Sequence, residues 1–411
     1  MRTVLEHRAA VLDLVRPLEP VAVPLDDAAG LVLAADVVAA ADVPAWDNSA
    51  MDGYAVRAAD VAGASREAAV RLPVVADLPA GSAAIPHVDA GTAARIMTGA
   101  PLPPGADAVV PVELTDGGVA EVRVLQPVPV GAHVRRAGED TTAGAVVLSA
   151  GTLLRAPHVA AVAAAGTDVV TVHRRPVVAV LSTGSELVRA GGPLGRGTIP
   201  DSNSHLLAAA VGAAGCVAVR HGPVPDDPSA LREVLATLDG TVDLVLTSGG
   251  VSVGAYDVVK QVLSAWGAVD FVPVAMQPGK PQALGTLPAG TPFVGLPGNP
   301  VSVHVSFEVF VRPALRRLRG LSDADPIVEA ATVPATVTTG WRSPAGRVQY
   351  MPVALCRSDG TWCARPASPG GSGSHLVTGL ARAEGLAVVP AEVTEVRPGD
   401  VVTVMRSDLC E

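Results

Sequence analysis

The sequence predicts a multidomain protein of the α/β plus β class, and three observations lead to this fold class. The chain has 411 residues, which is more than a single hydrophobic core usually supports. Between residues 175 and 320, apolar runs of strand length alternate with runs of helix length, as in crossover units of a largely parallel sheet. On both sides of that region, short β-rich runs are separated by turns, for which the chain supplies 42 glycines and 36 prolines.

The N-terminal third predicts two helices with a β-rich module between them. Apolar residues at Val4, Val11 and Leu18 belong to a helical stripe that ends at prolines. A second apolar run, 157–166, predicts another helix, which we expect to pack on the first. From residue 47 to about residue 126, β-rich runs alternate with proline and glycine clusters, which predicts a small inserted β-rich module.

The central region predicts a parallel sheet, and the C-terminal region predicts a small barrel. Strands are expected within 176–187, 215–224, 243–250 and 291–298, with helices at 202–215, 226–238 and 301–318. The last helix carries its basic residues at its C-terminal end, where they stabilise the helix dipole. From residue 327 the chain returns to short strands with frequent turns, which indicates a β-barrel.

Charge and composition argue against two classes of partner. Lys plus Arg number 30 and Asp plus Glu number 40, a net charge of −10 that disfavours nucleic-acid binding. The N-terminus lacks the apolar core of a secretory signal, and the longest weakly polar run, 159–172, is too short to span a bilayer. We therefore expect a cytoplasmic protein that binds neither nucleic acid nor membrane.

The four cysteines lack zinc-site spacing and are expected to be reduced, namely Cys216, Cys356, Cys363 and Cys410.

Three glycine-containing loops follow predicted parallel strands. They are Ser182–Glu186, Ser248–Gly254 and Pro297–Pro300. Open α/β sheets bind their ligands at the carboxyl ends of the strands, and glycine lets backbone N–H groups approach a phosphate closely. These loops predict a site for a phosphorylated or other anionic ligand, although each one alone is also explained as an ordinary tight turn.

Acidic side chains beside these loops predict a magnesium ion. Glu186 ends the first loop and Asp257 lies just past the second. Such acids would repel a phosphate unless a divalent cation lay between them, and Mg²⁺ takes one or two carboxylates together with phosphate oxygens. Either Asp226 or Asp227 is equally well explained as the N-cap of the next helix. Lys280, between two prolines, suits an oxyanion contact, with a solvated turn lysine as the alternative.

Two polar loops of the inserted module, Asp47–Ala55 and Met97–Asp107, fit no standard nucleophile pattern. The chain has no phosphate-binding loop of the nucleotide hydrolases and no dinucleotide-binding glycine pattern after its first parallel strand. The sequence therefore indicates neither a nucleotide hydrolase, nor a dehydrogenase, nor an enzyme of covalent acyl transfer.

Five motifs in order resemble the molybdopterin molybdenumtransferase (MoeA) family, to which part of gephyrin is related. They are DNSAMDGYA at 47–55, MTGAPLPPGADAVV at 97–110, STGSEL at 182–187, SGGVSVG at 248–254 and LPGNPVS at 296–302. The resemblance spans nearly the whole chain and implies an elongated homodimer of four-domain subunits. Its domains would be an elongated dimerisation domain (1–46 with 133–173), an inserted β-rich domain (47–132), an α/β molybdopterin-binding domain (174–321) and a C-terminal β-barrel domain (326–411).

The resemblance also implies the reaction and its participants. Molybdenum from molybdate would be inserted into adenylylated molybdopterin, with release of AMP in a Mg²⁺-dependent step. Besides a second copy of the chain, the implied partners are the molybdopterin adenylyltransferase and factors that mature downstream molybdoenzymes.

Site residues carry over from the family by motif. The implied catalytic residues are Asp52, Thr98, Glu186, Asp226, Asp257 and Lys280, with Glu186 and Asp257 as metal ligands. Asp52 and Thr98 would come from the inserted module of the partner subunit. The implied ligand-binding residues are Thr183, Gly184, Ser185, Ser248, Gly249, Gly250, Val251, Ser252, Gly254, Pro297, Gly298, Asn299, Pro300 and Ser374.

The chain departs from some relatives at Pro273 and Gln277, where those relatives have lysines. Lys280, Gln277 and either Ser374 or Ser372 are therefore the candidates for the molybdate contact. Two other functions stay open. A molybdopterin adenylyltransferase would share the 175–320 domain but not the inserted loops, and a gephyrin-like interaction scaffold would not need the acidic residues.

Overall fold

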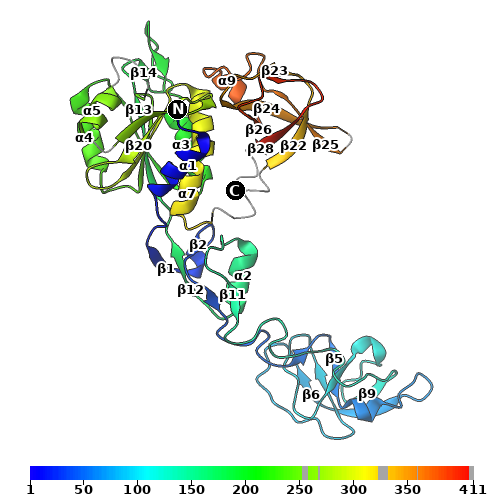
Figure 1. Ribbon diagram of the computed structural model, residues 1–411. Helices are drawn as coiled ribbons and strands as arrows, with labels where there is room; N and C mark the ends of the chain where they lie inside the picture. Colours follow the sequence, from blue (N-terminus) through cyan, green and yellow to red (C-terminus); the bar gives the residue numbers. More distant parts are fainter. Residues whose placement is uncertain (252–257, 267–268, 323–331, 359, 407–411) are drawn as a thin grey trace.

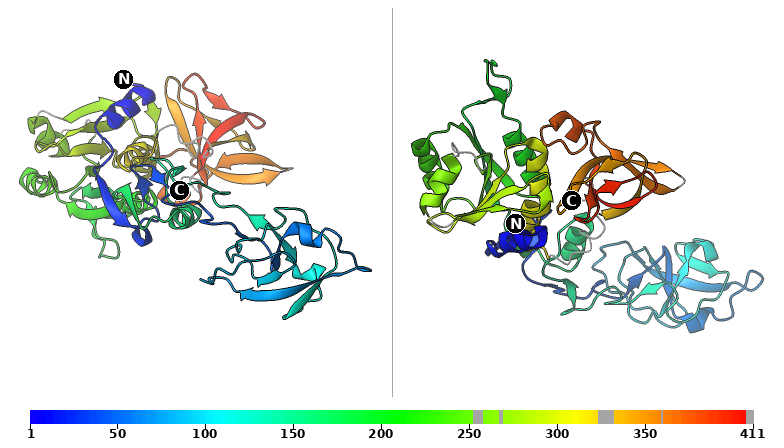
Figure 2. Two further views of the ribbon diagram at one scale, coloured as in Figure 1. Left: turned by 90° about the horizontal axis from the view of Figure 1, so that it is seen from below. Right: turned by 45° about the horizontal axis from the view of Figure 1, so that its top comes forward.

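The computed structural model describes residues 1–251, 258–266, 269–322, 332–358 and 360–406, and it shows an elongated molecule (Figure 1). An α/β body and a C-terminal barrel lie side by side at one end, and a middle domain leads to a β-rich domain at the other end (Figures 1 and 2). The predicted fold class is confirmed. We call the middle domain and the β-rich tip domain together the arm.

The α/β body contains a six-stranded sheet in the order β16-β13-β17-β21-β20-β18. The first four strands are parallel, as predicted, whereas β20 and β18 add an antiparallel edge that the sequence analysis did not predict. The strands are β13 (Val177–Thr183), β16 (Val217–Val224), β17 (Leu244–Ser248), β18 (Val269–Pro273), β20 (Pro281–Thr286) and β21 (Pro292–Leu296). A short pair, β14 (Leu187–Val188) and β15 (Ile199–Pro200), projects from the body.

Helices cover both faces of this sheet because its strands are apolar on both sides. Along β13, Val178 and Val180 belong to one buried cluster, and Ala179 and Leu181 belong to another. Helices α4 (Pro228–Leu238) and α5 (Val258–Trp266) line the second cluster. The first cluster is lined by α1 (Val4–Asp13), by α3 (Asn203–Ala213) and by a continuous helical stretch. This stretch consists of α6 (Pro300–Ser306), the π-helical η4 (Phe307–Val311) and α7 (Arg312–Leu318).

The N-terminal helix α1 belongs to the body and not to the arm. Its buried residues Val4 and Val11 pack in the same cluster as η4 and α7. The second predicted helix, α2 (Ala156–Ala164), lies in the middle domain, where Val162 is buried with Leu33 and Val172. Our expectation that the two helices pack on each other is therefore wrong, since each apolar face finds a different core. The predicted domain boundaries themselves stay a prediction.

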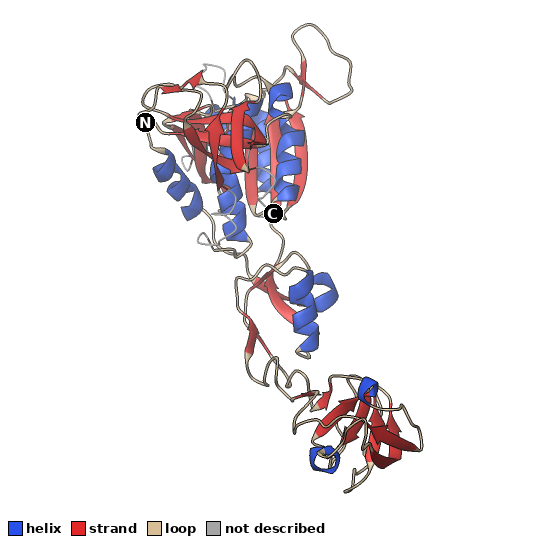
Figure 3. Cartoon of the chain, turned by 90° about the vertical axis from the view of Figure 1, so that its right-hand side faces the viewer, coloured by secondary structure: helices blue, strands red, loops and turns tan. Residues whose placement is uncertain are grey.

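The arm is built mainly of strands, with α2 in its middle domain (Figure 3). The middle domain contains β1 (Pro20–Pro24), β2 (Val32–Leu33), β3 (Val37–Val38), β11 (Val146–Leu148) and β12 (Val169–His173). The tip domain has a five-stranded sheet made of β5 (Gly53–Val56), β6 (Val70–Leu78), β7 (Ala93–Ile96), β8 (Ala108–Pro111) and β9 (Glu121–Val124). Between them, β4 (Asn48–Ser49) pairs with β10 (Val134–Arg135) and forms the neck of the arm.

The C-terminal domain is the predicted barrel. Its strands follow the order β24-β25-β22-β28-β26, and a pairing of β26 with β24 closes the ring. They are β22 (Thr332–Val337), β24 (Val348–Ser358), β25 (Thr361–Pro366), β26 (Gly385–Val389) and β28 (Val401–Arg406), with the short pair β23 (Trp341–Arg342) and β27 (Glu395–Val396) and the helix α9 (Val377–Leu380) beside them. Strand β19 (Met276–Gln277) of the body pairs with β24, so the sheet of the barrel reaches into the body.

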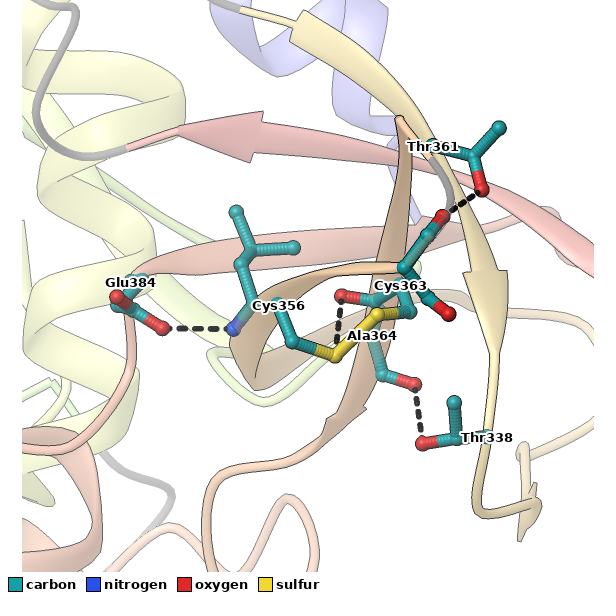
Figure 4. Close-up of a disulfide and its surroundings, with 8 residues drawn as sticks. Thr338, Cys356, Thr361, Cys363, Ala364 and Glu384 are labelled. Atoms are coloured by element: carbon teal, nitrogen blue, oxygen red, sulfur yellow. Dashed lines mark hydrogen bonds between the residues drawn. A yellow bond between two sulfur atoms is a disulfide. The ribbon is translucent and has the colours of Figure 1, made fainter.

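Two of the four cysteines are paired. Cys356 on β24 and Cys363 on β25 face each other across the hairpin and form a disulfide (Figure 4). The expectation of reduced cysteines is therefore wrong for these two, because the hairpin register brings them opposite each other. Cys216 is free and buried, as expected, and Cys410 lies outside the described residues. None of the described helices has the length and apolar character needed to span a bilayer.

Candidate functional site

The three glycine-containing loops begin side by side at the carboxyl edge of the central sheet. They follow β13, β17 and β21, which are neighbours in the sheet. Ser182 is in register with Ser248, and Ser248 is in register with Leu296, so the loops start at the same height. The parallel order of these strands thus brings together three loops that are spread over more than a hundred residues of the sequence.

Glycine is required where these loops meet. Gly249 has a φ of +89°, and a Cβ there would lie 3.1 Å from the carbonyl oxygen of Thr183. Its N–H donates to the carbonyl oxygen of Leu296 at 3.1 Å, and a Cβ on Gly298 would lie 3.6 Å from the Cα of Gly249. Asn203, at the start of α3, donates from Nδ2 to the carbonyl oxygen of Gly298 at 2.7 Å. The predicted ligand loops therefore form one continuous surface.

Two acidic residues lie at the first loop, and they differ in their contacts. The carboxylate of Glu186 is exposed and folds back over Gly184, where a Cβ would lie 2.5 Å from Oε2. Asp226 instead accepts from the N–H of Ser185 at 2.9 Å, and its own N–H donates to Ser185 Oγ at 3.0 Å. The N-cap of α4 is Asp227, which accepts from the N–H of Ala230 at 2.7 Å. The alternative left open by the sequence is thereby decided, because Asp226 fixes the loop and Asp227 caps the helix.

The C-terminal domain contributes Ser374 to this surface. Asn299 Nδ2 donates to Ser374 Oγ at 3.0 Å, and the N–H of Val301 donates to the Ser374 carbonyl oxygen at 3.0 Å. Ser372 accepts a 3.2 Å hydrogen bond from Gln349 Nε2, a side chain buried in the barrel. Of the two candidate serines, Ser374 is thus the one that contacts the loop after β21.

Two basic side chains lie near the junction of the body and the barrel. Lys280 is exposed, and within the described chain its ammonium group has no ion-pair partner. Arg347 Nη1 donates to Gln277 Oε1 at 3.4 Å. Sequence reasoning missed Arg347 because its proximity depends on the pairing of β19 with β24, which no local motif indicates.

Asp52 and Thr98 meet in the tip domain, next to the neck, where the N–H of Gly99 donates to the carbonyl oxygen of Ser49 at 2.8 Å. Asp52 Oδ1 accepts from both the N–H and the hydroxyl of Thr98, each at 2.7 Å. The backbone N–H of Thr98, followed by its hydroxyl, lowers the pKa of the Asp52 carboxyl below its ordinary value. Both side chains are exposed, and the α/β loops lie at the opposite end of the molecule (Figure 1). One chain therefore does not bring this pair to those loops.

Three predicted site residues, Ser252, Gly254 and Asp257, lie outside the described residues. In the described part of the chain, no group of three or more His, Cys, Asp or Glu side chains is arranged to hold a metal ion. The exposed carboxylate of Glu186 accepts no hydrogen bond from the described residues, so both of its oxygens are available to a metal ion. The other ligands of that ion would have to be substrate or water oxygens. Mg²⁺ is such a metal, since one or two carboxylates together with phosphate oxygens and water complete its shell.

Comparisons with known proteins cover nearly the whole chain. Family models match the chain at residues 2–166 (MoeA N-terminal region, domain I and II), 179–317 (probable molybdopterin binding domain) and 334–406 (MoeA C-terminal region, domain IV). The chain is 46% identical over 405 residues to molybdopterin molybdenumtransferase 2 of Mycobacterium tuberculosis, which covers 97% of this chain and 98% of that protein. It is 40% identical to a molybdopterin molybdenumtransferase of Nostoc sp., with 92% of this chain and 86% of that protein covered. A solved structure of the molybdopterin biosynthesis MoeA protein of Pyrococcus horikoshii OT3 superposes with a TM-score of 0.82 at 30% identity, covering 99% of this chain and 100% of that one.

Proposed function

Because the chain belongs to the MoeA family, we infer that it is a molybdopterin molybdenumtransferase, a transferase of molybdenum cofactor biosynthesis. The substrates are molybdate and adenylylated molybdopterin, and the products are the molybdenum cofactor and AMP. The observation that supports this function best is the meeting of three glycine loops, Glu186 and Ser374 at one edge of the sheet. A site of this kind suits a substrate with phosphate groups in its middle and polar groups at both ends.

The loops would bind the phosphates of the substrate. Gly249, Gly250 and Gly298 leave their backbones open to close approach, and Asp226 holds Ser185 so that the first loop keeps its shape. Ser374 would complete the pocket from the barrel side through its contact with Asn299. Binding therefore orients the phosphoric anhydride without any protein nucleophile.

We place Glu186 and Asp257 as the residues that would hold Mg²⁺. When bound, Mg²⁺ supplies Lewis-acid stabilisation of the negative charge that builds up on the phosphates as the anhydride breaks. Glu186 suits this role because its carboxylate is exposed directly beside the phosphate loop. Asp226 is less suited to bind the metal directly, because one of its carboxylate oxygens already accepts a hydrogen bond from the N–H of Ser185.

Molybdate would be received near Lys280 and Arg347. Pro273 and Gln277 leave this chain with fewer lysines here than some relatives have, and Arg347 restores positive charge through its contact with Gln277. A dianion such as molybdate is attracted by this pair of cations without any need for an overall positive protein.

Asp52 and Thr98 would act in the site of a second subunit. Their distance from the α/β loops within one chain supports a homodimer in which the arm of each subunit reaches the partner's site. There the Asp52 carboxylate, ionised and oriented by Thr98, would accept a proton or orient water at the end of the substrate where molybdate reacts.

The test is molybdate-dependent release of AMP from adenylylated molybdopterin by the purified protein in the presence of Mg²⁺. We expect AMP only when molybdate is added. Formation of adenylylated molybdopterin from molybdopterin and ATP would instead identify an adenylyltransferase. Unchanged AMP release after simultaneous Glu186→Gln and Asp52→Asn substitution would contradict the site assignment.

A further inference from the structure

The arm joins the body at a small junction. The chain passes from body to arm after Leu18 and returns after His173, and the end of α7 lies against both crossings. The N–H of Leu18 donates to the carbonyl oxygen of Leu318 at 2.9 Å. Nδ1 of His173 lies 2.5 Å from the carbonyl oxygen of Leu18. The angle of the arm is therefore set by contacts of a few residues near Leu318.

Arg319 bridges the two sides of this junction. Its Nη1 donates to the carbonyl oxygen of Ala214 at 2.9 Å, and its Nη2 donates to the carbonyl oxygen of Gly30 at 3.0 Å. Ala214 caps the C-terminal end of α3 in the body, whereas Gly30 directly precedes the β2 region of the middle domain. One rigid guanidinium thus holds a backbone group from each side, and its positive charge is favourable at the end of α3.

Glycines leave the room that this arrangement requires. A Cβ on Gly215 would lie 2.6 Å from Cζ of Arg319, so a side chain there would displace the guanidinium. Gly320, at a φ of +81°, lies so close under the ring of His173 that a Cβ would overlap Cδ2 of the ring. The junction is therefore closely packed and leaves little freedom for the arm to swing.

We propose that Arg319 is a positioning residue that fixes the angle between arm and body, and thereby places Asp52 and Thr98 in the site of the partner subunit. This inference rests on the proposed function and on the homodimer. Its physical basis is leverage, because a small rotation at the junction becomes a large displacement at the tip of an elongated arm (Figure 1). Misplacement of a reacting group by about 1 Å can lower a rate by about 10²-fold.

The chain provides a matched control for Arg319. Arg317, in the last turn of α7, whose C-cap is Arg319, donates from Nη1 to the carbonyl oxygen of Leu12 at 3.0 Å. Leu12 belongs to α1, which packs on the body, so this contact does not cross to the arm. Arg319→Ala and Arg317→Ala therefore remove similar arginine-to-carbonyl contacts, but only the first releases the junction.

The experiment combines kinetics with a distance measurement. We expect Arg319→Ala to lower kcat for AMP release by about tenfold or more, while KM for adenylylated molybdopterin stays within about twofold and the dimer is retained. Arg317→Ala should keep kcat near the wild-type value. Spin labels at the exposed positions Leu5 on α1 and Val75 on β6, in a chain with Cys216 and Cys410 replaced by serine, should report a broadened distance distribution for Arg319→Ala only. Labelled subunits are diluted with unlabelled chain so that each dimer carries one label pair.

Several outcomes decide the matter. An unchanged distance distribution in Arg319→Ala, or kcat losses of equal size in both variants, would overturn the positioning role. If Arg319→Ala does not fold, Arg319→Lys serves instead, because an ammonium group cannot bridge both carbonyl oxygens in the same fork, and wild-type kcat in that variant would also overturn it. Failure of the proposed function would look different, because the wild-type protein would then release no AMP in response to molybdate. The spin-label distances would still report whether Arg319 fixes the angle between arm and body.

Discussion

At the residue scale, the carboxylate of Asp52 is set by its neighbour Thr98. The Thr98 N–H and hydroxyl both donate to the same oxygen, and the N–H has the larger effect on the pKa of Asp52. Thr98→Val removes the hydroxyl but keeps the N–H and the side-chain shape. We expect the Asp52 pKa to rise toward the ordinary value of 3.8 without reaching it, and carboxyl-carbon NMR titration would measure the change. An unchanged pKa would show that the hydroxyl does not act on this carboxylate.

A second residue-scale prediction concerns Glu186. Glu186→Gln keeps the size of the side chain and removes its charge, so we expect the Mg²⁺ concentration for half-maximal AMP release to rise by about tenfold or more. Asp227→Asn is the matched control, because asparagine caps a helix as well as aspartate does and the Mg²⁺ requirement should not move. The measurement is AMP release across a Mg²⁺ titration, and equal curves for Glu186→Gln and the wild type would argue against a metal-binding role.

Local motifs named candidate site residues, which stay predictions, but they did not specify the contacts of these residues. Local motifs identified Glu186 and Asp226, yet they could not say whether Asp226 or Asp227 caps α4, since both precede the helix. The position of Arg347 beside Gln277 was not predictable, because it depends on how the barrel docks on the body. Neighbouring residues of one type compete for the same local contact, and contacts between domains need the assembled fold, so neither kind could be assigned from the sequence.

At the scale of elements, the docking of α1 makes stability depend on pH. His7 is fully buried against the ring of Phe310, with centroids 4.6 Å apart, and burial lowers its pKa from 6.5 to about 4. Unfolded chains therefore bind a proton at His7 between about pH 4 and pH 6.5 that the folded protein does not bind. This contribution to stability is complete above pH 6.5 and is lost as the pH falls toward 4, by about 3 kcal/mol at most.

His7→Leu should flatten this pH dependence. Leucine is apolar at every pH and of similar size, so denaturant unfolding between pH 4 and pH 7 should show a smaller slope of free energy against pH. An identical slope for His7→Leu and the wild type would refute the role of His7.

Helices and strands with a strong local sequence pattern were predictable. The way in which these elements pair and pack with distant parts of the chain was not. The alternation of β13 and β17 with helices predicted a parallel sheet, but the antiparallel edge formed by β18 and β20 depends on a reversal that no single motif carries. The apolar stripe of α1 predicted a helix correctly without saying which core it joins. The periodicity of apolar residues indicates that one face of a helix is buried, but it does not indicate which other element covers that face.

At the scale of the whole molecule, the shared site leads to a test by mixing subunits. Asp52→Asn and Glu186→Gln each inactivate a different half of the proposed site. In a mixed dimer, one of the two sites receives an intact Asp52 from one chain and an intact Glu186 from the other. Random exchange of equal amounts should restore about a quarter of the wild-type AMP release. No recovery after exchange would place both residues in the site of one chain.

The neck of the arm also determines whether the tip domain can be removed from the chain as a unit. Strands β4 and β10 run side by side, with Val134 opposite Ser49, and Asp47 accepts hydrogen bonds from Arg136 Nη1 at 2.6 Å and from the N–H of Ala137 at 2.8 Å. The two ends of the tip domain therefore meet, so the tip is a module that a short turn could replace without stretching the remaining chain. Its sequence can diverge, or be exchanged for that of another protein, independently of the sheet that binds the substrate.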